Sequence, residues 1–367
     1  MSFHRELSKA LMLNTRHSAR ASALFALILS WALVASFSAA QEPSSPAPSK
    51  GLQLVFLGTN GGPPLNLDRS EPSTLLIVDG RPYLIDCGIG TIRRMLRANI
   101  QSETVGTIFF THLHSDHDLG LADVMANDFS RIGPADSAHT IHIYGPPQTE
   151  ALVNAAFEYI RIPNSIFAAE RPGNPPLVSP FKAHEIQGPG LIYQDDKIRV
   201  IAAENAHYVV MPPAFRAKMK SYSYRFETPE GVVVFTGDTG PSDTVTELAK
   251  GADVLVSETS GATPAIISAF IRRMAERNHW SPERAKIFMA HMTQEHLNLQ
   301  QVGEMASRAR VKSVILYHSG SGNVTTYPPE VKKYYPGPVF APADLDRYCL
   351  VPPSGARPAS PALHPCR

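Results

Sequence analysis

Several features of common protein classes are missing from this 367-residue chain. It has no sequence repeat, no heptad pattern and no Gly-rich phosphate loop, and it contains only three cysteines. These absences exclude a repeat protein, a coiled coil and a P-loop nucleotide-binding site. With 43 % hydrophobic and 18 % charged residues, the composition is that of a globular protein with a sizeable core.

The chain also lacks an excess of charge of one sign. It has 34 Lys and Arg against 33 Asp and Glu, and the part after residue 40 carries a net charge near −2. Lys and Arg do not cluster, and Arg272, Arg273 and Arg277 share one predicted helix, most simply as its solvent-exposed face. This composition gives no electrostatic footprint for a nucleic-acid partner, so we expect none.

One long apolar run occurs, and it lies near the N-terminus. A basic stretch through Arg20 precedes the apolar residues 21–37, and the small residues Ser38, Ala39 and Ala40 follow. This order is typical of a secretory signal peptide, and 17 residues are short of the ~20 that a spanning helix needs. We therefore predict a signal peptide over residues 1–40 and an exported protein, periplasmic or secreted, with no stable membrane anchor after cleavage. A permanent anchor is the alternative.

The ends of the mature chain are rich in proline. Residues 41–50 form a predicted Pro/Ser linker, and residues 346–367 form a predicted Pro-rich tail. In an oxidising compartment Cys349 and Cys366 are the plausible pair, and closing that loop would contribute about 3 kcal/mol in the chain-entropy model. Cys87 ends an apolar segment and is expected to be a buried small hydrophobe.

Residues 51–345 predict one domain in which strands and helices alternate. Apolar or β-branched segments predict strands at 52–57, 74–78, 83–85, 105–111 and 140–144, and later at 198–203, 221–226, 232–236, 254–257 and 314–317. Helical patterns occupy 91–97, 119–129 and 149–159, and later 243–250, 264–277 and 299–308. Two such halves predict two packed sheets with helices outside, an α/β/β/α sandwich of four layers.

A dense motif of histidine and aspartate directly follows the apolar segment 107–110. The motif reads Thr-His-Leu-His-Ser-Asp-His-Asp over residues 111–118. In extended backbone His112 and His114 point to the same side, and a turn after His114 lets Asp116 and His117 face a second centre nearby. Chance would produce such a motif in on the order of one in a thousand chains. The segment therefore predicts ligands for two metal ions.

This motif after a strand resembles the signature of the metallo-β-lactamase superfamily, and the resemblance covers roughly residues 51–320. It extends to Leu-Gly-Thr at 57–59 with a Gly pair after it, to residues 86–91 and to residues 235–239. The resemblance implies the metallo-β-lactamase sandwich. It also implies a two-metal centre whose ligands are His112, His114, Asp116, His117, His207, Asp238 and His318, with Asp238 bridging both ions.

Each distant ligand has a simpler interpretation when it is taken alone. His207 could be a satisfied strand-end histidine, Asp238 a turn carboxylate and His318 a strand cap. Together they follow apolar strands at the position where open α/β layers place sites, which favours the metal centre. Zinc, two ions per chain, is expected from imidazole and carboxylate ligands, with manganese or iron as alternatives. The nucleophile is then a metal-bridging hydroxide, and Asp116 counts among the catalytic residues.

Further features are similar to the branch that contains ribonuclease Z, arylsulfatases and class II cyclic-nucleotide phosphodiesterases. True β-lactamases of this fold lack the bridging Asp, and glyoxalase II-like thioesterases usually have Thr-Pro-Gly-His where this chain has Asn-Ala-His207. Glu258 and His296 match the accessory Glu and His of ribonuclease Z. The resemblance implies that His296 protonates the leaving oxygen and that Glu258 fixes its tautomer. His291 competes for this role, and both histidines could instead be polar residues at a helix start.

The substrate is less sharply defined than the site. Ribonuclease Z carries a basic arm for transfer RNA, but here the interval 155–199 is charge-balanced, and export would separate the protein from transfer-RNA precursors. We therefore expect a small anionic ester, a phosphodiester or an aryl sulfate. A ribonuclease Z-like endoribonuclease and a lactonase are enzymatic alternatives, and a non-catalytic exported binding protein is the alternative from another class. A homodimer remains open.

Export makes a direct prediction. Because signal peptidase removes the leader, protein isolated from its native host should lack about 40 N-terminal residues. Intact-mass measurement together with cell fractionation tests this. An intact Met1 in a cytoplasmic fraction would contradict it.

Overall fold

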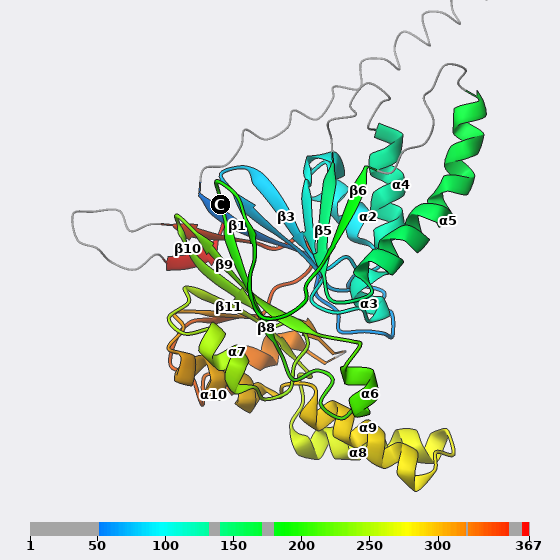
Figure 1. Cartoon of the computed structure of the whole chain (residues 1–367). Helices are drawn as coiled ribbons and strands as arrows, with labels where there is room; N and C mark the ends of the chain where they lie inside the picture. Colours follow the sequence, from blue (N-terminus) through cyan, green and yellow to red (C-terminus); the bar gives the residue numbers. More distant parts are fainter. Residues whose placement is uncertain (1–50, 132–139, 171–179, 321, 352–361, 367) are drawn as a thin grey trace, which may run out of the picture. The chain divides into compact units, whose positions relative to one another are not determined.

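The computed structural model describes residues 51–131, 140–170, 180–320, 322–351 and 362–366. The predicted signal peptide and linker lie outside these residues. Two mixed sheets form the centre of the described part (Figure 1). In spatial order the first sheet contains β15 (Ala362–Pro365), β14 (Arg347–Val351), β1 (Leu52–Gly58), β2 (Ser73–Val78), β3 (Arg81–Ile85), β4 (Thr107–Phe109), β5 (Ile141–Gly145) and β6 (Phe181–Glu185).

The second sheet repeats this mixture of antiparallel and parallel pairs. In spatial order it contains β13 (Val339–Phe340), β12 (Val314–Ser319), β11 (Val254–Thr259), β10 (Gly231–Phe235), β9 (Tyr222–Thr228), β8 (Arg199–Glu204) and β7 (Gly190–Gln194). Strands β3 to β6 run parallel in the first sheet, and β10 to β13 run parallel in the second. Parallel strands end at one edge, so loops from the same edge of each sheet can meet there.

Side chains from both sheets interlock in a shared core. Phe109 of β4 contacts the rings of Tyr224 and Phe226 from β9, and all three are buried. Aromatic contacts of this kind bury a large apolar area between the sheets. A separate apolar cluster lies on the outer side of each sheet, which leaves two faces to be covered by helices.

Helices cover these outer faces. The first sheet is covered by α2 (Thr91–Arg97), α4 (Leu121–Arg131) and α5 (Thr149–Glu170), and the second by α7 (Asp243–Leu248), α10 (Leu299–Ala309) and α11 (Tyr327–Val331) (Figure 1). Two short helices, α3 (Ser115–Asp118) and α6 (Pro213–Arg216), lie in loops. Two more, α8 (Pro264–Arg277) and α9 (Pro282–Gln294), pack chiefly against each other. The predicted four-layer α/β/β/α sandwich is confirmed.

The C-terminal segment differs from the expectation of a tail. The sheet continues past residue 345, because β14 pairs with β1 and β15 pairs with β14. Tyr348 and Leu350 are buried at alternate positions of β14, a strand pattern that the surrounding prolines obscure in the sequence. The predicted domain boundary is therefore wrong. A disulfide joins Cys349 to Cys366, and Cys87 is a buried free thiol, as expected.

Several helices differ from the sequence-based ranges. Helix α5 continues through Pro163 to Glu170, beyond the expected end at residue 159, and α9 was not anticipated. The segment 105–111 forms only the short strand β4, because the backbone leaves the sheet to present the histidine motif. Among the described residues, no helix combines the length and hydrophobicity that crossing a membrane requires.

Candidate metal centre

The predicted ligands come from loops at one end of the sandwich. The histidine motif follows β4 and includes α3, His207 follows β8, and Asp238 follows β10. His318 lies near the end of β12 and has a left-handed backbone, with φ of 46°. The structure thus brings together all seven residues that the sequence assigned to metal.

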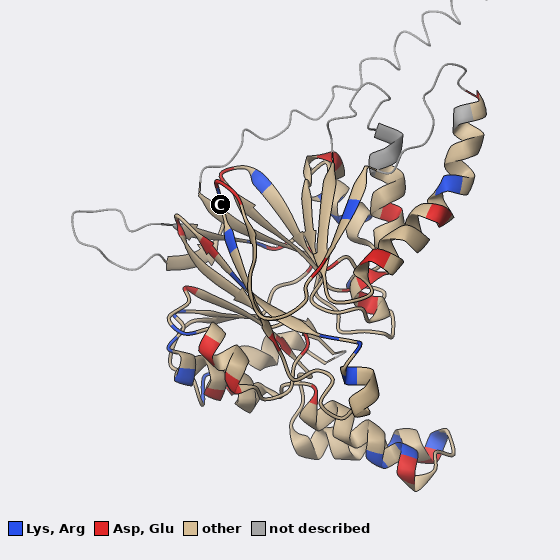
Figure 2. Ribbon diagram, viewed as in Figure 1, with Lys and Arg blue, Asp and Glu red and all other residues tan. Residues whose placement is uncertain are grey.

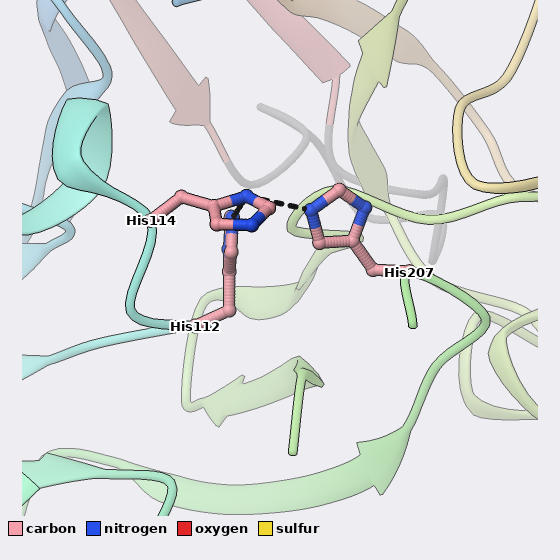
Figure 3. A group of neighbouring side chains, drawn as sticks. All are labelled: His112, His114 and His207. Atoms are coloured by element: carbon pink, nitrogen blue, oxygen red, sulfur yellow. Dashed lines mark hydrogen bonds between the residues drawn. The ribbon is translucent and has the colours of Figure 1, made fainter. Parts of the chain in front are cut away.

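Three imidazoles form one side of the centre. The rings of His112, His114 and His207 point toward one another (Figure 3). The Nδ1 atom of His114 lies 3.1 Å from Nε2 of His112 and 3.0 Å from Nε2 of His207. His112 and His207 are fully buried, so water cannot satisfy these nitrogens from outside. Three convergent imidazole nitrogens form a set that suits a transition-metal ion.

Asp116, His117 and His318 form the other side. The Oδ2 atom of Asp116 lies 3.2 Å from Nε2 of His318 and 3.6 Å from Nε2 of His117. The backbone amide of Gly62 donates to this carboxylate over 2.9 Å. A Cβ atom at Gly62 would lie 2.3 Å from the Asp116 side chain, so only glycine permits this approach. Gly62, the second glycine of the pair noted in the sequence, therefore holds Asp116 in place.

Asp238 lies between the two sides and contacts both. Its Oδ2 atom is 3.9 Å from Nε2 of both His112 and His207, and 3.2 Å from Nε2 of His318. Its Oδ1 atom is 3.5 Å from Nε2 of His117. Burial raises the pKa of this carboxyl, but the neighbouring histidines lower it well below its usual value, so it stays ionised. The Asp238 carboxylate therefore contacts both groups of predicted ligands.

Two buried atoms of the centre have no hydrogen-bond partner, namely Nε2 of His117 and Oδ1 of Asp238. Buried polar atoms normally have a partner, and a bound ion is one reason for an exception. Both atoms face the middle of the cluster, and the ligand atoms in each group of three lie within 4.8 Å of one another. The residues present therefore fit a metal ion.

A buried carboxylate fixes the orientation of His117. Asp86 accepts a hydrogen bond from Nδ1 of His117 over 2.8 Å and also binds the amide of Thr111. This contact leaves Nε2 of His117 directed at the centre, the usual arrangement behind a metal-binding histidine. Asp86 lies in a motif that carries the family resemblance, but no role was predicted for it. Its position directly after a strand of apolar residues was the available signal.

The accessory pair predicted from the resemblance also forms. Nδ1 of His296 lies 3.4 Å from Oε2 of Glu258, and the other carboxylate oxygen accepts the amide of Leu297 over 2.7 Å. Burial lowers the pKa of His296, but the Glu258 carboxylate reverses this effect and raises the pKa to about 9. His296 is also 3.9 Å from Asp238, at the edge of the metal cluster. His296, rather than His291, therefore lies beside Glu258 and the predicted metal ligands.

His291 instead contacts Glu295, a residue that the sequence analysis missed. Oε2 of the fully buried Glu295 lies 2.8 Å from Nδ1 of His291, and Oε1 accepts the amide of Val210 over 2.9 Å. The backbone carbonyl of Glu295 accepts a hydrogen bond from Nδ1 of His207 over 3.0 Å. One residue thus orients a predicted metal ligand and holds the loop that carries it.

Comparison with known proteins identifies the family. The family described as Beta-lactamase superfamily domain matches residues 81–319, which is more than half of the chain. The chain belongs to the β-lactamase superfamily. This membership agrees with the resemblance and, together with relatives named ribonuclease Z, makes the protein a metal-dependent hydrolase.

Curated relatives lie in one branch of the superfamily. Ribonuclease Z of Mycobacterium bovis is 32 % identical over 207 residues, which cover 56 % of this chain and 69 % of the relative. Ribonuclease Z of Mycobacterium marinum is 28 % identical over 268 residues, covering 73 % and 86 %. These relatives support the branch that the sequence analysis favoured.

Solved structures show the same fold. The metallo-β-lactamase fold protein YhfI of Bacillus subtilis matches with a TM-score of 0.58 and 16 % identity, covering 82 % of this chain and 99 % of that one. The short form of human tRNase Z matches with a TM-score of 0.55 and 19 % identity, covering 80 % and 98 %.

The position of Glu295 generates a prediction. Replacing Glu295 with Ala removes the acceptor of the partly buried Val210 amide and should loosen the loop of His207. We expect metal affinity to fall about 10- to 100-fold, as for other residues that orient metal ligands. Competition with a chromophoric chelator measures this affinity.

Matched variants separate positioning from general damage. Glu295→Gln keeps an oxygen for the Val210 amide and should recover most of the affinity. Glu283→Ala removes an exposed carboxylate from the helix that precedes Glu295 and should change nothing. Metal affinity that is unaltered in folded Glu295→Ala would show that Glu295 has no positioning role.

Proposed function

We propose that this hydrolase holds two zinc ions and cleaves a phosphodiester bond in an anionic substrate. The observation that carries the proposal is the buried Asp238 carboxylate, which contacts both ligand groups beside the Glu258–His296 pair. Support for the phosphodiester comes from the relatives, which are named ribonuclease Z. An aryl sulfate is also a negatively charged ester, but the relatives described above are named ribonuclease Z and give no support for a sulfate substrate.

The ligand set favours two ions rather than one. His112, His114 and His207 would hold the first, Asp116, His117 and His318 the second, and Asp238 would contact both. Imidazole and carboxylate ligands without cysteine suit zinc, with manganese or iron as alternatives. Two such cations, when bound, lower the pKa of water and neutralise charge that develops on the reacting oxygens.

The Glu258–His296 pair supplies the proton for the leaving oxygen. Because Nδ1 of His296 faces Glu258, Nε2 is free to face the substrate. The raised pKa keeps the ring protonated near neutral pH, so Nε2 can donate. Glu258 is fully buried and its second oxygen is held by the Leu297 amide, so the carboxylate cannot turn away. His296 is then the general acid, and Glu258 is its positioning residue.

We also propose that the protein acts outside the cytoplasm. The order of basic, apolar and small residues at the N-terminus supports this proposal. The Cys349–Cys366 disulfide supports it independently, because such bonds persist in oxidising compartments.

The metal centre can be tested without an activity assay. Elemental analysis of the zinc-saturated protein should find two ions per chain. Asp238→Ala should bind clearly less metal, because it removes the carboxylate that both ligand groups share. Asp196→Ala, which changes an exposed aspartate, is the control and should keep both ions. One ion or none in the saturated wild-type protein would contradict the two-metal proposal.

The role of His296 predicts a dependence on the leaving group. His296→Ala should keep its metal but lower kcat by roughly 10²–10⁴ on a phosphodiester with a poor leaving group, the usual contribution of general acid catalysis. With a nitrophenyl ester the defect should shrink, because nitrophenolate departs without a proton. Steady-state kinetics on both substrates measure the difference.

Two further variants check the assignment. Glu258→Ala added to His296→Ala should cost little more, because the two residues act as a unit. His291→Ala should retain activity on the poor leaving group. Equal losses on both substrates in His296→Ala, or the full defect in His291→Ala, would remove His296 from the acid role.

A further inference from the structure

Helices α8 and α9 form an antiparallel hairpin that the described mechanism does not use. The helices are joined by residues 278–281, and Ser268 of α8 contacts Met289 of α9. Figure 1 shows the hairpin projecting away from the second sheet. At a rise of 1.5 Å per residue, the 13 residues of α9 extend about 20 Å.

The hairpin begins and ends at the metal centre. Its first helix starts a few residues after Glu258, and its second helix ends next to Glu295. The ring of His291, in the last turn of α9, lies 4.9 Å from the ring of His296 and 6.0 Å from that of His207. A long substrate bound at the metals therefore has the hairpin directly beside it.

Positive charge is concentrated on the hairpin. Residues 264–294 contain five cations, Arg272, Arg273, Arg277, Arg284 and Lys286, against the two acids Glu276 and Glu283. All five cations are exposed, and Figure 2 shows the Lys and Arg positions gathered toward the outer half of the hairpin. The net charge of the whole chain, near zero, conceals this local excess.

These cations are not neutralised by carboxylates. Within the described residues none of the five forms an ion pair, and Arg284 instead lies 4.8 Å above the ring of Trp280. Many other surface cations do pair, as Arg81 does with Asp196 and Lys220 with Glu204. The hairpin is therefore free to attract an anion from solution.

Aromatic side chains are interleaved with these cations. Phe270, Arg273 and Arg277 are spaced so that they share one face of α8, and Phe270 is 44 % exposed. Trp280 lies at the turn and packs against Phe288. Cations that follow a phosphate backbone, with aromatic rings between them for the bases, are the combination that binds single-stranded nucleic acid.

We propose that the α8–α9 hairpin binds the phosphate backbone of a single-stranded nucleic acid and leads it to the metal centre. The inference rests on the proposed phosphodiesterase function, and it revises the expectation that no nucleic acid binds. A second copy of the chain is a poor occupant, because five cations would face five others. A membrane is a poor occupant too, because the hairpin tip carries Arg277, His279 and Glu283. The exposed apolar residues Ile266, Phe270 and Ile287 lie away from the tip, and cations separate them from it.

The test compares two triple variants of the full chain. The first replaces Arg272, Arg273 and Arg277 with Gln. The control makes the same change at Arg93, Arg97 and Lys182, which are also exposed but lie on α2 and β6. Fluorescence anisotropy with a labelled 20-nucleotide single-stranded RNA gives Kd across a series of salt concentrations, and a gel verifies that the RNA stays intact. Metal content and thermal unfolding verify that both variants are folded.

The hairpin variant should weaken binding by about tenfold or more at low salt. The slope of log Kd against log salt should fall by about 2, since each lost phosphate contact in a single strand contributes about 0.7. The control should bind as the wild type does. A second variant, Arg284→Gln with Lys286→Gln, should lower the slope by about 1.

Two outcomes would overturn the proposal. One is unchanged RNA affinity in the hairpin variant. The other is that the wild-type and control proteins bind phosphatidylglycerol vesicles without RNA and the hairpin variant does not. Hydrolysis of bis(p-nitrophenyl) phosphate by the wild-type protein tests the phosphodiesterase function separately. Its absence would contradict that function while leaving the RNA-binding result in place.

Discussion

The carboxylate of Asp238 is buried among five histidines, and the fold of both sheets provides the contacts that compensate its charge. An isolated carboxylate in such a place would be strongly disfavoured by the loss of hydration. The two sheets deliver His112, His207 and His318 to it from separate loops, so the charge is compensated only when both halves of the sandwich are packed. The centre and the fold are therefore energetically coupled. Metal ions, when bound, add to the same compensation.

Buried carboxylates also contact the histidines in and beside the predicted metal centre. Asp86 contacts His117, Glu258 contacts His296, and Glu295 contacts His291 while its carbonyl holds His207. Each histidine is thereby oriented by a carboxylate or a carbonyl; for His117, His207 and His296 this group comes from a different element, and for His291 it comes from the C-terminal end of its own helix. The rings are held in place before any ligand arrives, which reduces the conformational entropy lost on binding. The short segment from Glu295 to Leu297 is central, because it contributes to three of these contacts and its Leu297 amide also donates to Glu258.

The sequence predicted the layers of the fold and the composition of the site because both leave local patterns. Alternating apolar segments mark most strands, and His112 to His117 lie within one short motif. His207, Asp238 and His318 lie far apart, and it was the family resemblance that joined them. Glu295 was missed because its role depends on a loop some 85 residues away, and no spacing rule connects the two. The strand β14 was missed because prolines follow it and because its partner, β1, lies at the other end of the domain.

The pairing of β1 with β14 has a consequence for how the protein reaches its folded state. Leu52 lies opposite Leu350, so the first sheet cannot be completed until almost the whole chain has been synthesised. Contacts of such large sequence separation form slowly, since a long loop must close first. A nascent chain therefore remains incompletely folded while it leaves the ribosome. That delay would favour the proposed export, because a chain that crosses a narrow translocation channel must still be unfolded.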